Sequence, residues 1–189
     1  MRLFLAIPLT AEIRANLRAM QTRLQRAGAE VRWVEPANFH LTVKFIGDQA
    51  DARVSEIETV CAEAAGAIAA FDLCIQGAGA FPKRGPLKTI WAGVSEGADA
   101  WKELVGCVEK PLLAFGVARE GGLVPHITLG RVKSETDALR AAIAAEAGTD
   151  CDRQRANKIV LIQSVLDPGG AAYTPVREWP LIESSTSVD

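Results

Sequence analysis

The chain has 189 residues, with 21 basic and 23 acidic side chains, a formal net charge of −2 and only two histidines. Because coating long DNA or RNA requires a large basic surface, this balance argues against that function but allows a short or terminal nucleic acid. Apolar residues make up 49% of the chain, as in globular proteins, and no apolar stretch approaches the ~20 residues of a membrane-spanning helix.

Strand and helix signals alternate along the first half of the chain. Thr10 can cap a helix whose apolar residues recur at helical spacing and which Gly28 ends. A second helix is expected near residues 54–68, with Asp51 as its cap. The strands expected in this half are 2–8, 31–34 and 38–46.

The second half repeats this order. A third helix is expected over residues 101–112, kinked by Pro111, and Ser134 and Asp137 open an alanine-rich fourth helix. The strands expected here are 71–76, 89–94, 124–132, 158–166 and 172–181. About four helices and eight strands predict a mixed α/β (α+β) domain.

The chain has no linker rich in Gly, Ser or Pro that would divide it. We therefore expect a single domain over residues 1–182 and a flexible polar tail over residues 183–189.

The cysteines contain no close pair, which excludes a zinc knuckle and a redox Cys-x-x-Cys motif. We expect reduced, mostly buried thiols in a cytoplasmic protein. The four are Cys61, Cys74, Cys107 and Cys151.

Both histidines lie in the same local pattern. His40 and His126 each begin a His-x-Thr-apolar motif in a strand-like segment, and the threonines are Thr42 and Thr128. In a strand, residues i and i+2 point to the same face, roughly 6.5–7 Å apart. If the two halves pack around a pseudo-twofold axis, both histidines and both threonines converge in one groove.

The same alternation predicts which side chains enter the core. In the first motif the core face would hold Phe39, Leu41, Val43 and Phe45, and Lys44 would share the opposite face with His40. In the second motif Ile127 and Leu129 would face the core.

Such a groove suits a phosphodiester. A neutral imidazole can take a proton from water while an imidazolium donates a proton to the leaving alcohol, and a reference pKa of ~6.5 allows both forms near neutral pH. Threonine hydroxyls can donate hydrogen bonds to the non-bridging oxygens. This scheme requires no metal or other cofactor. The alternative is chance similarity between two core strands, because a single His-x-Thr motif carries no functional information.

The paired motifs resemble those of the two-histidine (2H) phosphoesterases. The flanking residues are most similar to the RNA 2′,3′-cyclic phosphodiesterases of bacteria and archaea, also called 2′-5′ RNA ligases. The resemblance spans residues 2–182, and Val43 departs from it conservatively where Leu is more usual. The segments that carry it are 2–7, 32–34, 44–47 and 125–131.

The resemblance implies a two-lobed, pseudo-twofold fold with two mostly antiparallel sheets around a central groove and helices outside. It implies hydrolysis of an RNA-terminal 2′,3′-cyclic phosphate to a 2′-phosphate, and in some members 2′-5′ joining of RNA ends. By motif, His40 would donate the proton, His126 would accept it, and Thr42, Thr128 and Arg131 would bind the phosphate. We also expect a monomer that does not bind membranes.

Three further features stay open at the sequence level. Strict alternation places Arg131 on the face opposite His126, so a bulge near Gly130 is needed to turn it inward. Lys44 could meet RNA phosphates or be an ordinary exposed lysine. The loop 81–88, with Phe81 beside three cations, suits a single-stranded RNA end or is a solvated hairpin loop.

The remaining aromatic residues are expected in the core or between the lobes. They are Trp33, Trp91, Trp101, Trp179 and Tyr173.

Two other functions remain alternatives to RNA 2′,3′-cyclic phosphate hydrolysis. One is a 2H esterase for a cyclic nucleotide, ADP-ribose cyclic phosphate or an oligoadenylate. The other is a non-catalytic module that binds RNA ends.

Overall fold

A computed structural model describes residues 1–119, 121–167 and 170–183. The α-helices are α1 (Ala11–Gln25), α2 (Val54–Ala65), α3 (Ala98–Leu112) and α4 (Asp137–Ala145). The strands are β1 (Arg2–Pro8), β2 (Glu30–Trp33), β3 (His40–Asp48), β4 (Phe71–Phe81), β5 (Thr89–Glu96), β6 (His126–Ser134), β7 (Asp150–Ala156), β8 (Lys158–Asp167) and β9 (Gly170–Pro180). Short 3₁₀ turns occupy Pro36–Asn38, Asp51–Arg53 and Leu113–Phe115.

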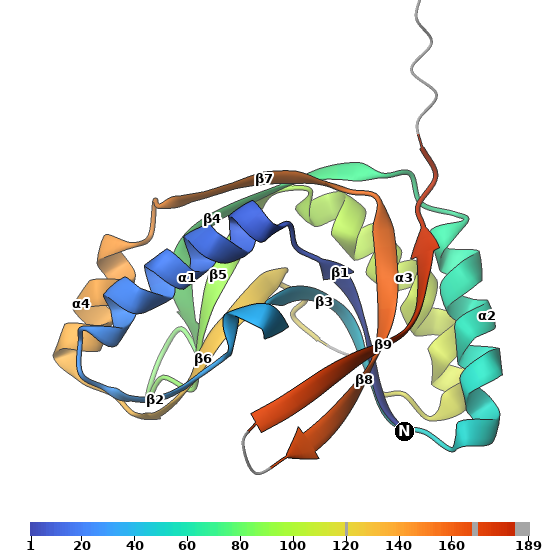
Figure 1. The fold of residues 1–189 in the computed structure, drawn as a ribbon, viewed down its shortest axis with the longest axis horizontal. Coiled ribbons are helices and arrows are strands. Elements are labelled where there is room, and N and C mark those ends of the chain that lie inside the picture. The colour runs from blue at the N-terminus through green and yellow to red at the C-terminus, as the bar shows by residue number, and fades with distance from the viewer. Residues whose placement is uncertain (120, 168–169, 184–189) are drawn as a thin grey trace, which may run out of the picture.

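The strands form two antiparallel sheets, one in each lobe (Figure 1). One sheet has the order β3-β1-β8-β9 and the other β2-β6-β5-β4-β7. The chain passes between the sheets repeatedly, since β2 lies in one sheet while β1 and β3 are paired in the other. Neither lobe is therefore a continuous stretch of sequence. The predicted two-lobed α/β fold is confirmed.

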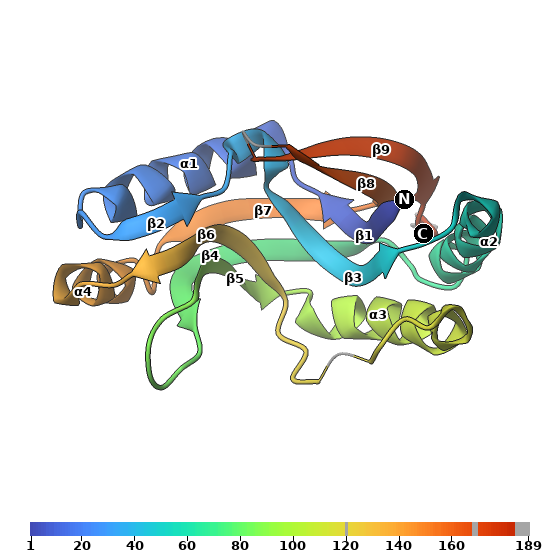
Figure 2. The same ribbon diagram turned by 90° about the horizontal axis from the view of Figure 1, so that it is seen from below.

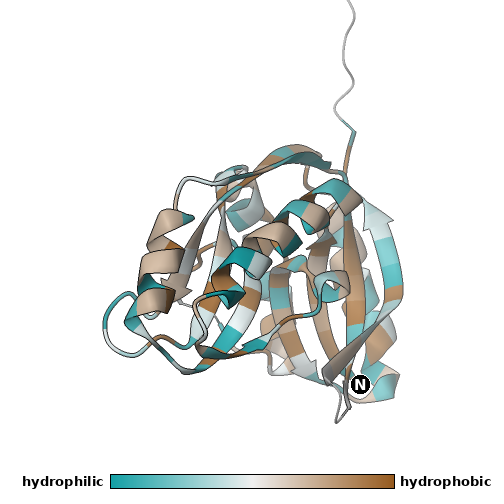
Figure 3. Ribbon diagram, turned by 60° about the vertical axis from the view of Figure 1, so that its left-hand side comes forward, coloured by the Kyte–Doolittle hydropathy of each residue, from teal (hydrophilic) through white to brown (hydrophobic). Residues whose placement is uncertain are grey.

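Helices cover the outer sides of both lobes. Helices α1 and α4 pack together at the lobe that holds β6, and α2 and α3 pack together at the lobe that holds β3 (Figure 1). Helix α1 begins where predicted, because Thr10 Oγ1 accepts a hydrogen bond from the Ile13 amide. Its apolar residues at helical spacing are buried, and hydrophilic residues alternate with them along the ribbon (Figure 3).

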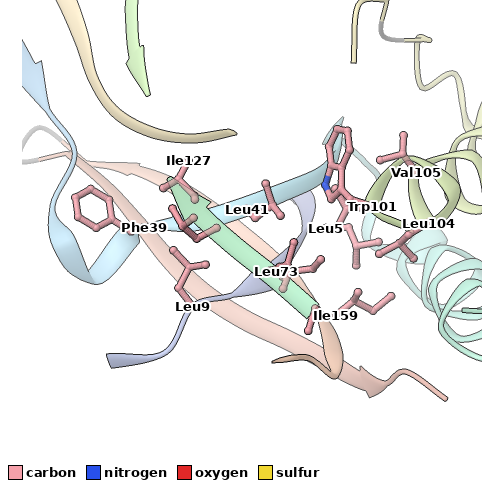
Figure 4. Close-up of a cluster of buried hydrophobic side chains, with 14 of the residues drawn as sticks. Leu5, Leu9, Phe39, Leu41, Leu73, Trp101, Leu104, Val105, Ile127 and Ile159 are labelled. Atoms are coloured by element: carbon pink, nitrogen blue, oxygen red, sulfur yellow. The ribbon is translucent and has the colours of Figure 1, made fainter. Parts of the chain in front are cut away.

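A single hydrophobic core connects the two lobes. Leu41 of β3 and Ile127 of β6 are both fully buried in it, and Figure 4 shows them beside Leu73 and Phe39. These two residues separate the histidine from the threonine in the two motifs. Their burial turns the histidines and threonines to the opposite face of each strand.

The elements differ from the sequence prediction in three places. Ser134 was expected to help open α4 but is the last residue of β6, and Thr136 caps α4 by accepting a hydrogen bond from the Leu139 amide. Strand β7 was not predicted, because Asp150, Arg153 and Arg155 make it polar; it forms an edge of its sheet and pairs only with β4. Asp51 does not cap α2, which has no side-chain cap hydrogen bond; its carboxylate instead pairs with the N-terminal ammonium at 3.4 Å.

Other predictions can be compared with the described residues. All four cysteines are free; Cys61 and Cys151 are buried, while Cys74 and Cys107 are partly exposed. Residues 184–189 of the predicted tail, and residues 168–169 of the turn between β8 and β9, lie outside the described residues. Within the described residues, no helix combines the length and apolarity required to span a membrane.

Candidate active site

The two motifs lie on neighbouring strands from different lobes. His40 and Thr42 are on β3, His126 and Thr128 are on β6, and the two strands are in contact near the centre of the molecule (Figure 2). All four side chains are partly exposed while the residues between them are buried. The strands thus present both motifs to solvent-accessible space between the lobes.

Two adjoining hollows receive these side chains. The larger, of about 280 Å³, is lined by His40, Thr42, Thr128 and Arg131 among others. The smaller, of about 150 Å³, is lined by His126. Thr42 and Phe45 line both hollows, so the two hollows adjoin at these side chains and together make up a cleft with one histidine in each part.

Each imidazole is held by its own backbone. His40 Nδ1 lies 2.7 Å from the carbonyl oxygen of Asn38, and His126 Nδ1 lies 2.8 Å from that of Val124. A carbonyl oxygen only accepts, so Nδ1 must carry the proton in both rings. This arrangement leaves Nε2 of each ring to exchange protons with a ligand.

Aromatic rings surround both histidines. The His40 ring centroid lies 4.7 Å from that of Phe4 and 5.5 Å from that of Tyr173. The His126 centroid lies 5.1 Å from that of Phe81 and 6.5 Å from that of Trp91. The rings therefore restrict the orientation of each imidazole.

Burial changes the pKa of His40. Desolvation lowers the pKa of His40 below its ordinary value of 6.5, the hydrogen bond to Asn38 opposes that shift, and the charge of His126 lowers the pKa further. This interaction between the two imidazoles disfavours charging both rings at once.

A bulge brings Arg131 into the larger hollow. In the ladder between β5 and β6, Ile90 pairs with Gly130 while Trp91 pairs with Thr128, so Leu129 is an extra residue. The bulge expected near Gly130 is thus present, and Arg131 points to the same side as Thr128. Its guanidinium donates a 3.4 Å hydrogen bond to Thr89 Oγ1.

Strand β3 has a bulge at the position that corresponds to the bulge in β6, three residues after the histidine. The prediction that Phe45 faces the core and Lys44 faces the groove is therefore wrong. Leu5 pairs with Lys44 while Ala6 pairs with Thr42, so Val43 is the extra residue. Lys44 is consequently fully buried, whereas Phe45 is 54% exposed. Lys44 Nζ donates to Glu109 Oε1 at 2.9 Å and to the Ala118 carbonyl at 2.8 Å, which excludes it from the RNA-facing surface.

Several wall residues were not identified from the sequence. Phe45, Arg2, Ser164 and Tyr173 all line the larger hollow. Tyr173 was expected in the core or between the lobes, and it is partly buried at this wall. The tryptophan prediction holds best for Trp101, which is 4% exposed and donates from Nε1 to the Thr42 carbonyl at 3.1 Å.

The basic loop lies near His126 through its first residue. Phe81 contacts the His126 ring, but Lys83, Arg84 and Lys88 are exposed and are not among the residues that line either hollow. Contact between this loop and RNA stays a prediction.

The described residues contain no group of three or more His, Cys, Asp or Glu side chains placed to hold a metal ion. The side chains that line the larger hollow include imidazole, hydroxyl, guanidinium and aromatic groups.

The chain resembles proteins of one family over nearly its whole length. A family model described as LigT-like phosphoesterase matches residues 7–91. An RNA 2′,3′-cyclic phosphodiesterase of Methanothermobacter thermautotrophicus is 32% identical over 182 residues, which cover 95% of this chain and 98% of that protein. This chain is a LigT-like 2H phosphoesterase.

Other members of the LigT-like family support the assignment. An RNA 2′,3′-cyclic phosphodiesterase of Aquifex aeolicus is 34% identical over 157 residues, covering 79% of this chain and 81% of that protein. The crystal structure of E. coli LigT in its apo form matches with a TM-score of 0.75 and 27% identity, covering 96% of this chain and 97% of that one. A Thermus thermophilus crystal structure matches with a TM-score of 0.77 and 27% identity, covering 96% and 98%.

Proposed function

We propose that this protein hydrolyses the terminal 2′,3′-cyclic phosphate of RNA to a 2′-phosphate without a metal ion. The observation that carries the proposal is the pair of imidazoles bordering one cleft, each with Nδ1 fixed by a backbone carbonyl and Nε2 left available. Relatives that carry the name RNA 2′,3′-cyclic phosphodiesterase support the substrate class. E. coli LigT, 26% identical, has also been crystallised with 3′-AMP.

The proposed reaction transfers two protons. His126 Nε2 accepts a proton from water, whose oxygen attacks phosphorus and forms the new P–O bond. The P–O3′ bond breaks, and protonated His40 donates its Nε2 proton to O3′. The phosphate stays on O2′, and the two histidines end with exchanged protonation states.

Negative charge on the phosphoryl oxygens requires donors during this step. The hydroxyls of Thr42 and Thr128 and the guanidinium of Arg131 line the same hollow as His40 and can donate hydrogen bonds to the non-bridging oxygens. The bulge after each threonine supports this role, because in β6 it turns Arg131 toward the phosphate position.

Binding of the substrate should change the pKa of His40 in the direction that a proton donor needs. The lowered pKa of His40 favours the neutral ring in the free protein. A bound phosphate places a negative charge near the imidazole, which raises the pKa and favours the imidazolium that the step needs.

The same arrangement suits the joining of RNA ends. If the 5′-hydroxyl of a second RNA replaces water, His126 accepts its proton and the product is a 2′-5′ phosphodiester. We include this activity in the proposal because only the attacking oxygen changes.

The test is incubation with a short RNA that ends in a 2′,3′-cyclic phosphate, in the presence of EDTA. We expect a product with its phosphate on O2′, identified by comparison with synthetic 2′- and 3′-phosphorylated standards. A 3′-phosphate product, or loss of activity on chelation, would contradict the proposal. Binding without hydrolysis would favour the alternative of a module for RNA ends.

A further inference from the structure

The larger hollow extends beyond the residues that the proposed reaction uses. Ser164 of β8 pairs with Tyr173 of β9, and the register of β1 against β8 places Arg2 beside Ser164. Directly opposed residues in antiparallel strands point to the same face. Arg2, Ser164 and Tyr173 thus form one row across three strands, and all three line the hollow.

At one end of this row Tyr173 lies beside His40, with ring centroids 5.5 Å apart, whereas Arg2 lies further from the two motifs along β1. Thr42 is paired with Ala6, and Phe45 is paired with Phe4, two residues nearer the start of β1. Arg2 is two residues further, which puts its backbone about 13 Å from the position of Ala6. A ligand that occupies the whole hollow therefore extends from the two threonines past Phe45 toward Arg2.

The electrostatics of the hollow favour a second anion. Among the described residues that line it, Arg131 and Arg2 are cationic and none is acidic. Desolvation raises the pKa of Tyr173, and the positive charges of Arg131 and Arg2 oppose that shift, so both arginines contribute positive potential at its hydroxyl. Within the described chain, neither arginine belongs to an ion pair, although many other surface cations do.

One acidic residue lies beside this row without lining it. Asp48 is opposite Arg2 in the ladder with β3, and no ion pair within 4.0 Å joins them. A phosphate that carries one or two negative charges can therefore engage the Arg2 guanidinium in two parallel hydrogen bonds.

We propose that Arg2, assisted by the hydroxyls of Ser164 and Tyr173, forms a subsite for the 5′-phosphate of the terminal nucleotide. This inference rests on the proposed function, which places the cyclic phosphate between the two motifs. The terminal nucleoside of an RNA joins a 2′,3′-cyclic phosphate to a 5′-phosphodiester, so its two phosphates can occupy the two ends of the hollow. The subsite selects RNA ends over nucleoside 2′,3′-cyclic phosphates that lack a 5′-phosphate.

A matched pair of substrates tests the subsite. Adenosine 2′,3′-cyclic phosphate is compared with the same molecule carrying a 5′-phosphate, and kcat/KM is measured for each. We expect the 5′-phosphorylated substrate to be preferred about 10- to 100-fold, the usual contribution of hydrogen bonds to a charged group. Equal values for the two substrates would overturn the inference.

The variant Arg2→Gln attributes the preference to this residue. We expect the preference to fall to within about threefold of unity, and Arg2→Lys to retain part of it, because a lysine keeps the charge but not the paired donors. Arg18→Gln, which removes an exposed arginine on α1, is the matched control and should keep the full preference. An unchanged preference in Arg2→Gln would place the 5′-phosphate elsewhere.

A binding measurement separates this inference from the proposed function. Adenosine 3′,5′-bisphosphate should bind the unaltered protein about 10- to 100-fold more tightly than 3′-AMP. Equal affinities would contradict the subsite even if hydrolysis is observed. Absence of hydrolysis with the short RNA that ends in a 2′,3′-cyclic phosphate would contradict the proposed function, while the difference in affinity would still decide whether the subsite exists.

Discussion

Burial lowers the pKa of His40, and this shift predicts how His40 contributes to the pH dependence of activity. His40 must be protonated to donate to O3′, so its titration limits activity on the alkaline side wherever His40 alone titrates. Because burial lowers the pKa of His40, the alkaline limb of kcat/KM in the His126→Ala variant, which reports His40 alone, should lie below 6.5. The alkaline limb of kcat should lie at higher pH, because bound phosphate stabilises the imidazolium.

Variants assign the two limbs. His40→Ala and His126→Ala should each lower kcat by about 10²–10⁴, the usual contribution of a general acid or base. The His126→Ala profile should keep only the alkaline limb, and the His40→Ala profile only the acidic limb. If each variant keeps the opposite limb, the two roles are reversed.

The exposed ring of Phe45 predicts a contribution to binding rather than to chemistry. Phe45 lines both hollows and is 54% exposed, so a nucleobase can stack on it with little change in the protein core. Stacking contributes about 1–3 kcal/mol per base, so Phe45→Ala should raise KM by about 5- to 150-fold and leave kcat nearly unchanged.

A control for lost apolar surface is available elsewhere on the molecule. Leu113→Ala removes another exposed apolar side chain, which lines neither hollow, and should leave KM unchanged. A drop in kcat with unchanged KM in Phe45→Ala would show that the ring orients reacting groups rather than binding the base.

At the scale of the strands, the two bulges show where sequence analysis succeeded and where it did not. The alternation of side chains between the two faces of a strand correctly predicted the positions of four residues, because all four precede the bulges. They are His40, Thr42, His126 and Thr128. The bulge in β6 could be inferred because alternation alone would have turned Arg131 away. No equivalent conflict was evident in β3, where lysine and phenylalanine both fit either face, so the reversal at Lys44 and Phe45 was missed.

The buried Lys44 connects β3 to α3 and to the segment that leads to β6, and it predicts a large effect on stability. Its ammonium contacts Glu109 of α3 and the carbonyl of Ala118. Lys44→Met keeps the aliphatic length but leaves the largely buried Glu109 carboxylate without this cation. Removing one partner of a buried ion pair should lower the free energy of unfolding by about 3 kcal/mol, measured by urea denaturation.

Two further variants isolate the electrostatic cause. Adding Glu109→Gln to Lys44→Met should recover part of the lost stability, because it removes the carboxylate charge that faced the lysine. Lys102→Met breaks an exposed ion pair with Asp99 and should change stability little. If Lys44→Met were as stable as the unaltered protein, the ion pair would not be what connects these elements.

At the scale of the whole molecule, the cleft is a product of pairings between distant segments. Its walls come from β1, β3, β6, β8 and β9, and the row of Arg2, Ser164 and Tyr173 exists only because β8 lies between β1 and β9. Local periodicity and motif spacing contain no information about that order. The two motifs were therefore recognisable from the sequence, whereas most of the residues around them were not.

The distribution of charge predicts a weak dependence on salt and on RNA length. Many lysines and arginines outside the cleft are paired with exposed carboxylates. The neighbouring negative charge weakens the attraction of these cations for a long phosphate backbone. Arg131 and Arg2 are the arginines that line the larger hollow, and none of the described lysines lines it. If these two arginines neutralise substrate phosphates, a plot of log(kcat/KM) against the logarithm of salt concentration should have a slope of about −1.4, from −0.7 for each contact with a single strand.

The slope is measured with an RNA of two nucleotides and an RNA of ten nucleotides, each ending in a cyclic phosphate, and the two slopes should agree. A slope of −3 or steeper for the longer RNA alone would show that contacts continue along the strand, and the exposed cations of the loop 81–88, whose Phe81 contacts His126, would be the first candidates to test.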